Sequence, residues 1–184
     1  MRLFVSVDLP DALVEPIRAL QAEFADADGL DFVDPATAHV TLKFLGDVEE
    51  SAYAETVAAV ERAVASTRVG PFDATFGGLG VFPSLDYISV LWLGLTAGAV
   101  ELAALHDAVE RECVAAGFDP DGTEFTPHVT LARMRHGGGK ELVRRLVRER
   151  DPEIGTARVE EVRVTESTLT HEGPEYETRE RFAL

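Results

Sequence analysis

The sequence predicts an α+β fold built as two similar lobes around a central groove. Stretches of alternating apolar and polar residues, typical of strands, are interspersed with stretches of helical periodicity. The tetrapeptide His-Val-Thr-Leu occurs twice, beginning at His39 and at His128, each time inside an expected strand. No Gly-, Ser- or Pro-rich linker separates the halves, so we interpret residues 1–184 as one bilobal domain with an internal duplication.

The first half is expected to alternate strands and helices. Its elements are a strand at 2–8, a helix from Pro10 to Phe24, a short strand at 30–33, a strand with the first motif that ends at Gly46, and an amphipathic helix at 49–66. Asp28-Gly29 provides the stop signal of the first helix.

The second half repeats the order of helix, motif strand and hairpin. Its expected elements are a β stretch from Pro71 with a bulge or bend at Gly77-Gly78, a strand at 87–95, a helix at 102–116, the second motif strand at 124–134, a short helix after Gly139, and β stretches at 156–168 and 175–184. We therefore expect two mainly antiparallel sheets with helices on their outer faces, and the motif strands adjacent across the groove.

Composition indicates a globular intracellular protein. No apolar stretch approaches the ~20 residues that a membrane-spanning helix needs. The opening MRLFVSVDLP lacks the long apolar region of a signal peptide. Cys113 is the only cysteine, which excludes an internal disulfide. We expect a cytoplasmic location.

The charge balance is strongly acidic. The chain has 33 Asp and Glu residues against 17 Lys and Arg, a formal net charge of −16. Such a surface is typical of proteins from salt-accumulating halophiles, where carboxylates keep the protein hydrated. It argues against broad binding to a nucleic-acid backbone, so a polyanionic ligand is expected at a local site.

The two motifs predict a cluster of polar side chains on one face of the sheet. In an extended strand alternate side chains share a face, so His39, Thr41 and Lys43 are expected to lie together, with Val40, Leu42 and Phe44 in the core. The second copy is expected to place His128 and Thr130 in the same way.

Two histidines facing one cavity suit acid–base chemistry on a phosphodiester. A neutral imidazole can take a proton from an attacking water while an imidazolium gives one to the leaving oxygen, and the ordinary pKa of ~6.5 allows both forms near neutral pH. The hydroxyls of Thr41 and Thr130 can donate to the phosphate oxygens.

The motifs allow two other interpretations. A single His-x-Thr on a strand is usually structural, but two identical copies favour a function. Two histidines can also bind zinc, yet zinc sites usually have three or four protein ligands, and the sequence contains neither HExxH nor CxxC. We expect no metal and no other cofactor.

With paired H-x-T-x motifs in a chain of this size, the sequence resembles the two-histidine (2H) phosphoesterase superfamily. Within it, the sequence is similar to the RNA 2',3'-cyclic phosphodiesterases, also called 2'-5' RNA ligase-like proteins. The opening RLFVSVDLP, HVTLKFLG, GLGVFP with VLWLGL, TPHVTLAR and the ending STLTHEGPEYETRERFAL all look like family landmarks in family order.

The resemblance implies metal-free hydrolysis of a 2',3'-cyclic phosphate at an RNA end to a 2'-phosphate. It implies that His39 is the proton donor to the leaving 3'-oxygen, that His128 is the proton acceptor, and that Thr41 and Thr130 bind the phosphate. The implied partners are RNA ends with a cyclic phosphate, tRNA fragments among them, or a cyclic nucleotide, with no membrane and no obligate protein partner.

Two further residues are candidate phosphate ligands, and two are candidates for stacking on a base. Lys43 shares the expected face of His39, and Arg133 follows the second motif, where it faces away if the strand is regular. Phe82 and Trp92 are the stacking candidates, with core packing as the favoured interpretation. The remaining histidines, His106, His136 and His171, and Cys113 are interpreted mainly as structural or solvated.

Two alternative functions remain from the sequence. The same groove could join RNA ends by a 2'-5' linkage, with a ribose hydroxyl in place of water. A module that binds RNA ends or nucleotides without catalysis is the alternative of another class. The matched pairs of histidine and threonine favour an enzyme, because binding alone does not need two titratable groups.

Overall fold

The structure is a computed structural model that describes residues 1–184. The strands are β1 (Arg2–Asp8), β2 (Leu30–Phe32), β3 (His39–Asp47), β4 (Phe72–Pro83), β5 (Ile88–Ala97), β6 (Val129–Met134), β7 (Glu153–Val159), β8 (Glu161–Thr170) and β9 (Gly173–Ala183). The helices are α1 (Val14–Ala22), α2 (Tyr53–Ser66), α3 (Ala99–Ala115) and α4 (Lys140–Glu149), and three short 3-10 turns precede α1, β3 and α2.

The nine strands form one antiparallel sheet in the order β7-β4-β5-β6-β3-β1-β8-β9, with β2 paired to β6. The α+β fold class is confirmed, but the two separate sheets that the sequence predicted are joined. The junction is the single pair Val40–Val129 between the two motif strands. The duplicated motifs therefore lie at the centre of the molecule.

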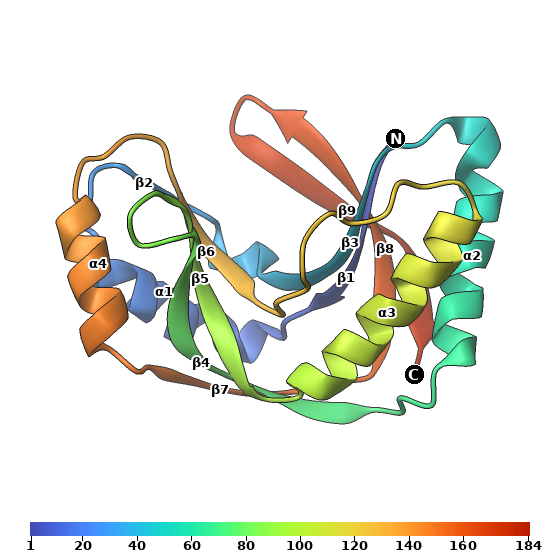
Figure 1. Ribbon diagram of the computed structural model, residues 1–184, viewed down its shortest axis with the longest axis horizontal. Coiled ribbons are helices and arrows are strands. Elements are labelled where there is room, and N and C mark those ends of the chain that lie inside the picture. Colours follow the sequence, from blue (N-terminus) through green and yellow to red (C-terminus); the bar gives the residue numbers. More distant parts are fainter.

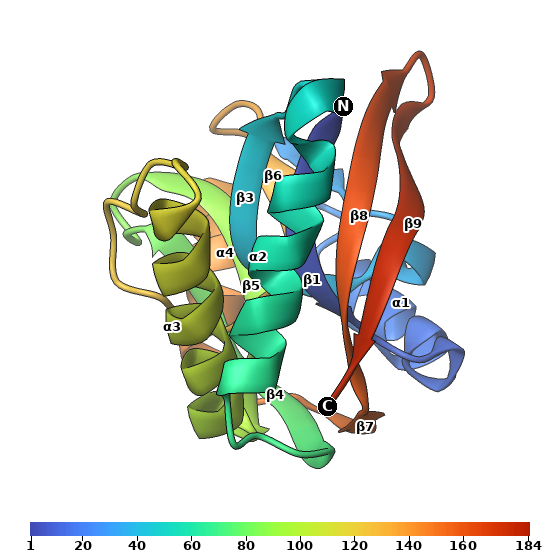
Figure 2. The same ribbon diagram turned by 90° about the vertical axis from the view of Figure 1, so that its right-hand side faces the viewer.

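The sheet curls, and all four helices lie on its outer side (Figure 1). The long helices α2 and α3 run side by side over the half of the sheet that contains β3, β1, β8 and β9 (Figure 2). The helices α1 and α4 cover the other half, near β7 and β4. The β8–β9 hairpin projects beyond the rest of the sheet (Figure 1).

Two expected strands differ from the structure. The stretch 156–168 is divided at Glu160, because β7 pairs with β4 in one half and β8 pairs with β1 in the other. The second motif strand begins at Val129 rather than at 124, because the preceding residues form a loop held by side chains of α3 and β3.

The apolar core lies between the helices and the outer face of the sheet. One continuous cluster of buried side chains includes Val5 of β1, Val40 and Leu42 of β3, and Val129 and Leu131 of β6. Both motif strands are thus anchored by the inward residues that the alternation predicted. None of the helices is long and apolar enough to cross a membrane.

Candidate active site

The two His-x-Thr motifs face each other across the β3–β6 junction. Val40 and Val129 are paired and buried, so their neighbours in each strand point to the opposite, inner face of the curled sheet, which carries no helix and is called the groove side below. Continuing the antiparallel register by one residue places His39 across from Thr130 and Thr41 across from His128. Side chains opposite each other on one face lie about 5 Å apart at Cβ. The two histidines and two threonines therefore form one cluster.

Each imidazole is fixed by the same hydrogen bond. Nδ1–H of His39 donates to the carbonyl oxygen of Thr37 at 2.8 Å, and Nδ1–H of His128 donates to that of Thr126 at 2.6 Å. In both cases the acceptor lies two residues before the histidine. Because Nδ1 carries the proton, Nε2 of the neutral ring is free to accept one. Each histidine thus presents Nε2 as its reactive nitrogen.

The surroundings of the two imidazoles shift their pKa values in the same direction, but the charged neighbours of the two rings differ. Burial lowers the pKa of His39 and of His128 below the ordinary value, although the hydrogen bonds to the Thr37 and Thr126 carbonyls oppose this shift. The carboxylate of Asp8 also acts to raise the pKa of His39. By contrast, the other charges that act on His128, from His39 and Arg133, both lower its pKa.

A β-bulge interrupts each motif strand at its leucine. Ser6 pairs with Thr41 and Val5 with Lys43, so Leu42 has no partner in β1. In β6, Thr130 pairs with Trp92 and Ala132 with Leu91, so Leu131 has no partner in β5. A bulge puts two consecutive side chains on the same side, which reverses the alternation beyond it.

The first bulge overturns the predicted placement of Lys43 and Phe44. Lys43 is 2% exposed and points to the helix side, whereas Phe44 is 67% exposed. The Phe44 ring lies 6.2 Å from that of Phe4, which in turn lies 5.0 Å from His39. Lys43 therefore cannot reach a phosphate held by His39 and Thr41, and it is not a substrate ligand.

The second bulge turns Arg133 toward the groove. Leu131 and Ala132 are both buried, so the exposed Arg133 lies on the face of Thr130 rather than opposite to it, as a regular strand would place it. Its positive charge acts to lower the pKa of both His39 and His128. Arg133 forms no ion pair, although carboxylates outnumber cations in this chain. Its guanidinium is free to bind an anion.

Each bulge is secured by a side chain from a helix. Nδ1–H of His106 on α3 donates to the Leu42 carbonyl at 2.7 Å, and the amide of Gln21 on α1 donates to the Leu131 carbonyl at 3.0 Å. Both helix residues are buried. The Leu131 carbonyl also accepts the Val33 amide at 3.0 Å, so Gln21 adds a second bond there. These bonds stabilise the shifted register.

Aromatic rings line both ends of the cluster. His128 lies 4.8 Å from the ring of Phe82 and 6.0 Å from that of Trp92. His39 lies 5.0 Å from Phe4 and 5.4 Å from Tyr176, a residue of the projecting β8–β9 hairpin. The stacking candidates are thus half-buried walls of the groove rather than core residues.

The sequence interpretation missed Asp8, Phe4, Phe44 and Tyr176. In β1 Asp8 pairs with His39, and its carboxylate accepts hydrogen bonds from Ser6 at 3.0 Å and Arg163 at 2.6 Å. Period-two alternation in RLFVSVD puts Phe4 and Asp8 on one face, a signal that was present. Tyr176 had no such signal, because its place depends on how the last hairpin crosses the sheet.

The other candidate residues lie outside the cluster. Cys113 is buried on α3, and burial raises the pKa of its thiol to about 11. His136 accepts a hydrogen bond from the Gly138 amide, and His171 is exposed in the β8–β9 turn. No group of three or more His, Cys, Asp and Glu side chains is arranged to hold a metal ion.

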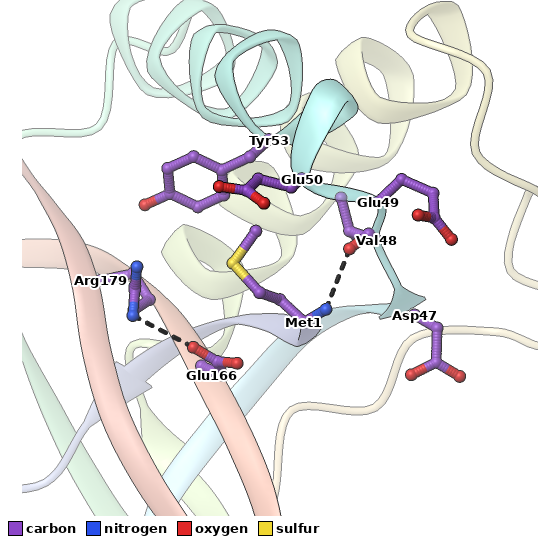
Figure 3. A pocket seen from close by; sticks show the side chains of 8 residues that line it. All are labelled: Met1, Asp47, Val48, Glu49, Glu50, Tyr53, Glu166 and Arg179. Atoms are coloured by element: carbon purple, nitrogen blue, oxygen red, sulfur yellow. Dashed lines mark hydrogen bonds and ion pairs between the residues drawn. The ribbon is translucent and has the colours of Figure 1, made fainter.

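A cavity of about 700 Å³ opens elsewhere, beside the N-terminus (Figure 3). It is lined by Met1, Asp47, Val48, Glu49, Glu50, Tyr53, Glu166 and Arg179. The Met1 ammonium group donates to the Val48 carbonyl, and Arg179 forms an ion pair with Glu166. No residue of either motif lines this cavity.

The fold and the paired motifs together are those of a two-histidine phosphoesterase. The model of the 2'-5' RNA ligase superfamily matches residues 9–169, and the chain belongs to that family.

Several relatives are similar over most of their length. The chain is 40% identical over 147 residues to the RNA 2',3'-cyclic phosphodiesterase of Aeropyrum pernix, covering 79% of this chain and 81% of the relative. It is 35% identical over 188 residues to the enzyme of the same name from Methanothermobacter thermautotrophicus, covering 100% and 99%. A crystal structure of a Thermus thermophilus protein superposes with a TM-score of 0.82 at 26% identity, covering 100% of this chain and 98% of that one. Escherichia coli LigT complexed with 3'-AMP shares the fold, with a TM-score of 0.80 at 24% identity and coverage of 100% and 97%.

Proposed function

We propose that this protein hydrolyses 2',3'-cyclic phosphates at RNA ends to 2'-phosphates, without a metal ion. The observation that carries the proposal is the pair of imidazoles on one face of adjoining strands, each tied through Nδ1 so that Nε2 is left free. Such a pair can act from both sides of one phosphorus atom. The similar proteins of Aeropyrum pernix and Methanothermobacter thermautotrophicus are RNA 2',3'-cyclic phosphodiesterases, which supports the same reaction.

In the proposed step, a water molecule attacks the phosphorus and the bond to the 3'-oxygen breaks. Nε2 of neutral His128 accepts the proton from water, and Nε2–H of protonated His39 donates a proton to the departing 3'-oxygen. The products are a 2'-phosphate and a free 3'-hydroxyl, and the exchanged protonation states of the two rings are restored by solvent. Each proton transfer contributes about 10²–10⁴-fold to the rate.

Asp8 supports the assignment of His39 as the acid. A carboxylate beside an imidazole favours the protonated ring, and Asp8 acts in this way on His39 only. His128 lies against Phe82 and Trp92, with positive neighbours that favour its neutral form. The two halves are therefore electrostatically unequal despite their matching motifs.

Three groups are positioned to bind the phosphate. The hydroxyls of Thr41 and Thr130 form no hydrogen bond within the protein. Both side chains face the groove, Thr41 beside His128 and Thr130 beside His39. Arg133 adds a free guanidinium on the same face. These donors can stabilise the negative charge that accumulates on the non-bridging oxygens in the transition state. Lys43 has no part in this proposal.

The proposal extends to partners and location. The substrate is RNA with a cyclic phosphate end, tRNA fragments among such RNAs, or a cyclic nucleotide. The protein acts in the cytoplasm. Joining of RNA ends by a 2'-5' linkage would use the same groups, with a ribose hydroxyl attacking the phosphorus in place of water and the bond to the 3'-oxygen breaking as before.

The test is turnover of an oligonucleotide that ends in a 2',3'-cyclic phosphate, in excess chelator and over a range of NaCl up to molar concentrations. We expect conversion to the 2'-phosphate isomer at an undiminished rate in the chelator. His39→Ala and His128→Ala should each lower kcat by about 10²–10⁴-fold, because each removes one proton transfer.

His171→Ala is the matched control, since it removes an exposed histidine from a turn outside the groove and should leave turnover unchanged. Loss of turnover in the chelator would overturn the metal-free mechanism. Full activity of either catalytic variant would overturn the role assignment. Tight binding of the RNA end by the wild type without turnover would favour the binding module.

A further inference from the structure

The loop before His128, residues 119–127, depends on side chains for its position. None of the backbone hydrogen bonds made by loops and turns involves these residues, and they belong to no helix or strand. Yet the loop contains, close to its end, Thr126, whose carbonyl accepts the hydrogen bond from the His128 ring. The orientation of this imidazole therefore depends on whatever fixes the loop.

The strongest tie comes from Lys43 on β3, the strand of the first motif. Its ammonium group donates to the Asp119 carbonyl at 3.0 Å, to Asp121 Oδ1 at 2.9 Å and to Glu110 Oε2 at 2.5 Å. These three bonds use all three of its donors. Glu110 in turn accepts the Asp121 amide at 2.7 Å. The start of the loop is thereby fixed to β3 and α3.

The end of the loop is held by a stacked pair. The Phe125 ring lies parallel to that of His106, with centroids 4.1 Å apart and an interplanar angle of 6°. His106 also donates to the Leu42 carbonyl in the first bulge. The bulge at Leu42 therefore acts on the loop twice, since it turns Lys43 inward and supplies the acceptor that orients His106.

The positive charge of Lys43 is balanced by the carboxylates of Glu110 and Asp121. Burial alone would raise the pKa of Glu110, but the hydrogen bonds from Lys43 and the Asp121 amide hold it below its ordinary value. Burial likewise acts to lower the pKa of Lys43, and the bonds to Glu110 and Asp121 raise it instead. Both partners stay ionised throughout the neutral range. A buried ammonium with three matched acceptors specifies one geometry, which an apolar side chain would not.

We infer that Lys43 is a positioning residue for His128, which couples the first motif to the second catalytic strand. Lys43 touches neither substrate nor reacting atoms, and it acts through Asp119, Asp121 and the loop that contains Thr126. The inference rests on the proposed function only for its kinetic readout, because the state of the His128 ring can be measured without turnover.

The experiment compares Lys43→Met with wild type by NMR of the imidazole Nδ1–H protons and by kinetics. We expect the hydrogen-bonded Nδ1–H signal of His128 to broaden or vanish while that of His39 persists. We also expect kcat to fall about 10-fold to 100-fold with KM changed less than about twofold, because misplacing a catalytic group affects the transition state more than binding. Lys43→Arg, which keeps the charge, should recover part of the loss.

Val143→Ala is the control for lost stability, because it removes buried volume on α4, away from this loop, and should leave both signals and kcat unchanged. If Lys43→Met does not fold, Asp121→Asn tests the same link by weakening one of the Lys43 bonds and should affect the Nδ1–H signal of His128 alone.

Equal persistence of both Nδ1–H signals with wild-type kcat, or equal loss of both, would overturn the inference. Absence of turnover in the wild type would contradict the proposed function instead and would leave the NMR comparison decisive.

Discussion

At the residue scale, the two catalytic candidates are distinguished by one carboxylate. His39 and His128 share their motif, their Nδ1 hydrogen bond and a pKa lowered by burial. Only His39 has Asp8 beside it, held in place by Ser6 and Arg163. Two copies of one motif can thus differ in their charged surroundings because of a single neighbour on another strand.

This asymmetry predicts the pH dependence of kcat/KM, which reports the free enzyme. Activity should rise as His128 loses its proton and fall as His39 loses its proton. Because burial lowers both pKa values, both limbs should lie below the ordinary histidine value of 6.5, with an optimum at mildly acidic pH.

Asp8→Asn should move the limb that belongs to His39 to lower pH, because it removes the charge that raises this pKa. The limb that belongs to His128 should stay in place. Activity at pH 7 should fall by about threefold to tenfold, the lower end of what a neighbouring charge produces. Asp73→Asn, on the exposed face of β4, is the control and should move neither limb. A basic limb unmoved by Asp8→Asn would contradict this account.

At the element scale, the motif strands could be predicted but their bulges could not. Alternation correctly placed His39, Thr41, His128 and Thr130 on the groove side, because the bulges follow the threonines. Beyond the bulges, alternation gave the wrong face for Lys43 and Phe44. A bulge depends on contacts with distant segments, here hydrogen bonds from helix side chains to carbonyl groups of the strand. The periodicity of a sequence carries no information about such contacts.

The same limit applies to Arg133 and Tyr176. A regular strand would direct Arg133 away from His128, and the second bulge directs it into the groove. Tyr176 reaches His39 because the β8–β9 hairpin pairs along β1. The order of strands across a sheet depends on contacts between distant segments. The alternation of residues therefore predicted the last strand, but it did not predict which residues that strand lies beside.

The second bulge should depend on Gln21. Its amide donates to the Val33 carbonyl at 2.7 Å and to the Leu131 carbonyl at 3.0 Å. Gln21→Met keeps the volume and removes both bonds, so we expect a loss of about 1–3 kcal/mol in the free energy of unfolding, measured by urea denaturation. We also expect a several-fold rise in KM, because Arg133 follows the bulge.

Thr56→Val provides the comparison, since it removes a buried hydroxyl on α2 that bonds only within its helix. It should cost stability without changing KM. A Gln21→Met variant with unchanged KM would show that the bulge persists without this amide.

At the scale of the whole molecule, the curled sheet joins two halves at the motif strands. The junction consists of the pair Val40–Val129, and the remaining strands of each half diverge from it. The continuous sheet and core support our interpretation of one bilobal domain, which remains a proposal. The loop 119–127, whose start is bonded to Lys43 of β3, leads from α3 over one half to β6 in the other.

The molecule as a whole carries a large excess of negative charge. Sixteen ion pairs engage most of the cations, but fewer than half of the carboxylates have a cationic partner. Several unpaired carboxylates gather around the cavity beside Met1, among them Glu49 and Glu50 (Figure 3). Repulsion among such charges destabilises the compact state.

Salt should therefore stabilise the fold. Raising NaCl from about 0.05 M to 1 M shortens the Debye length to about 3 Å and screens the repulsion, whereas the buried bonds of Lys43 are screened less. We expect Tm to rise by several degrees over this range in thermal unfolding followed by circular dichroism. The double variant Glu49→Gln/Glu50→Gln should have a higher Tm than wild type at low salt and a weaker dependence on NaCl, because it removes part of the same repulsion. A Tm that falls as NaCl is added would mean that surface ion pairs outweigh the net charge, and it would remove the halophile interpretation of the composition.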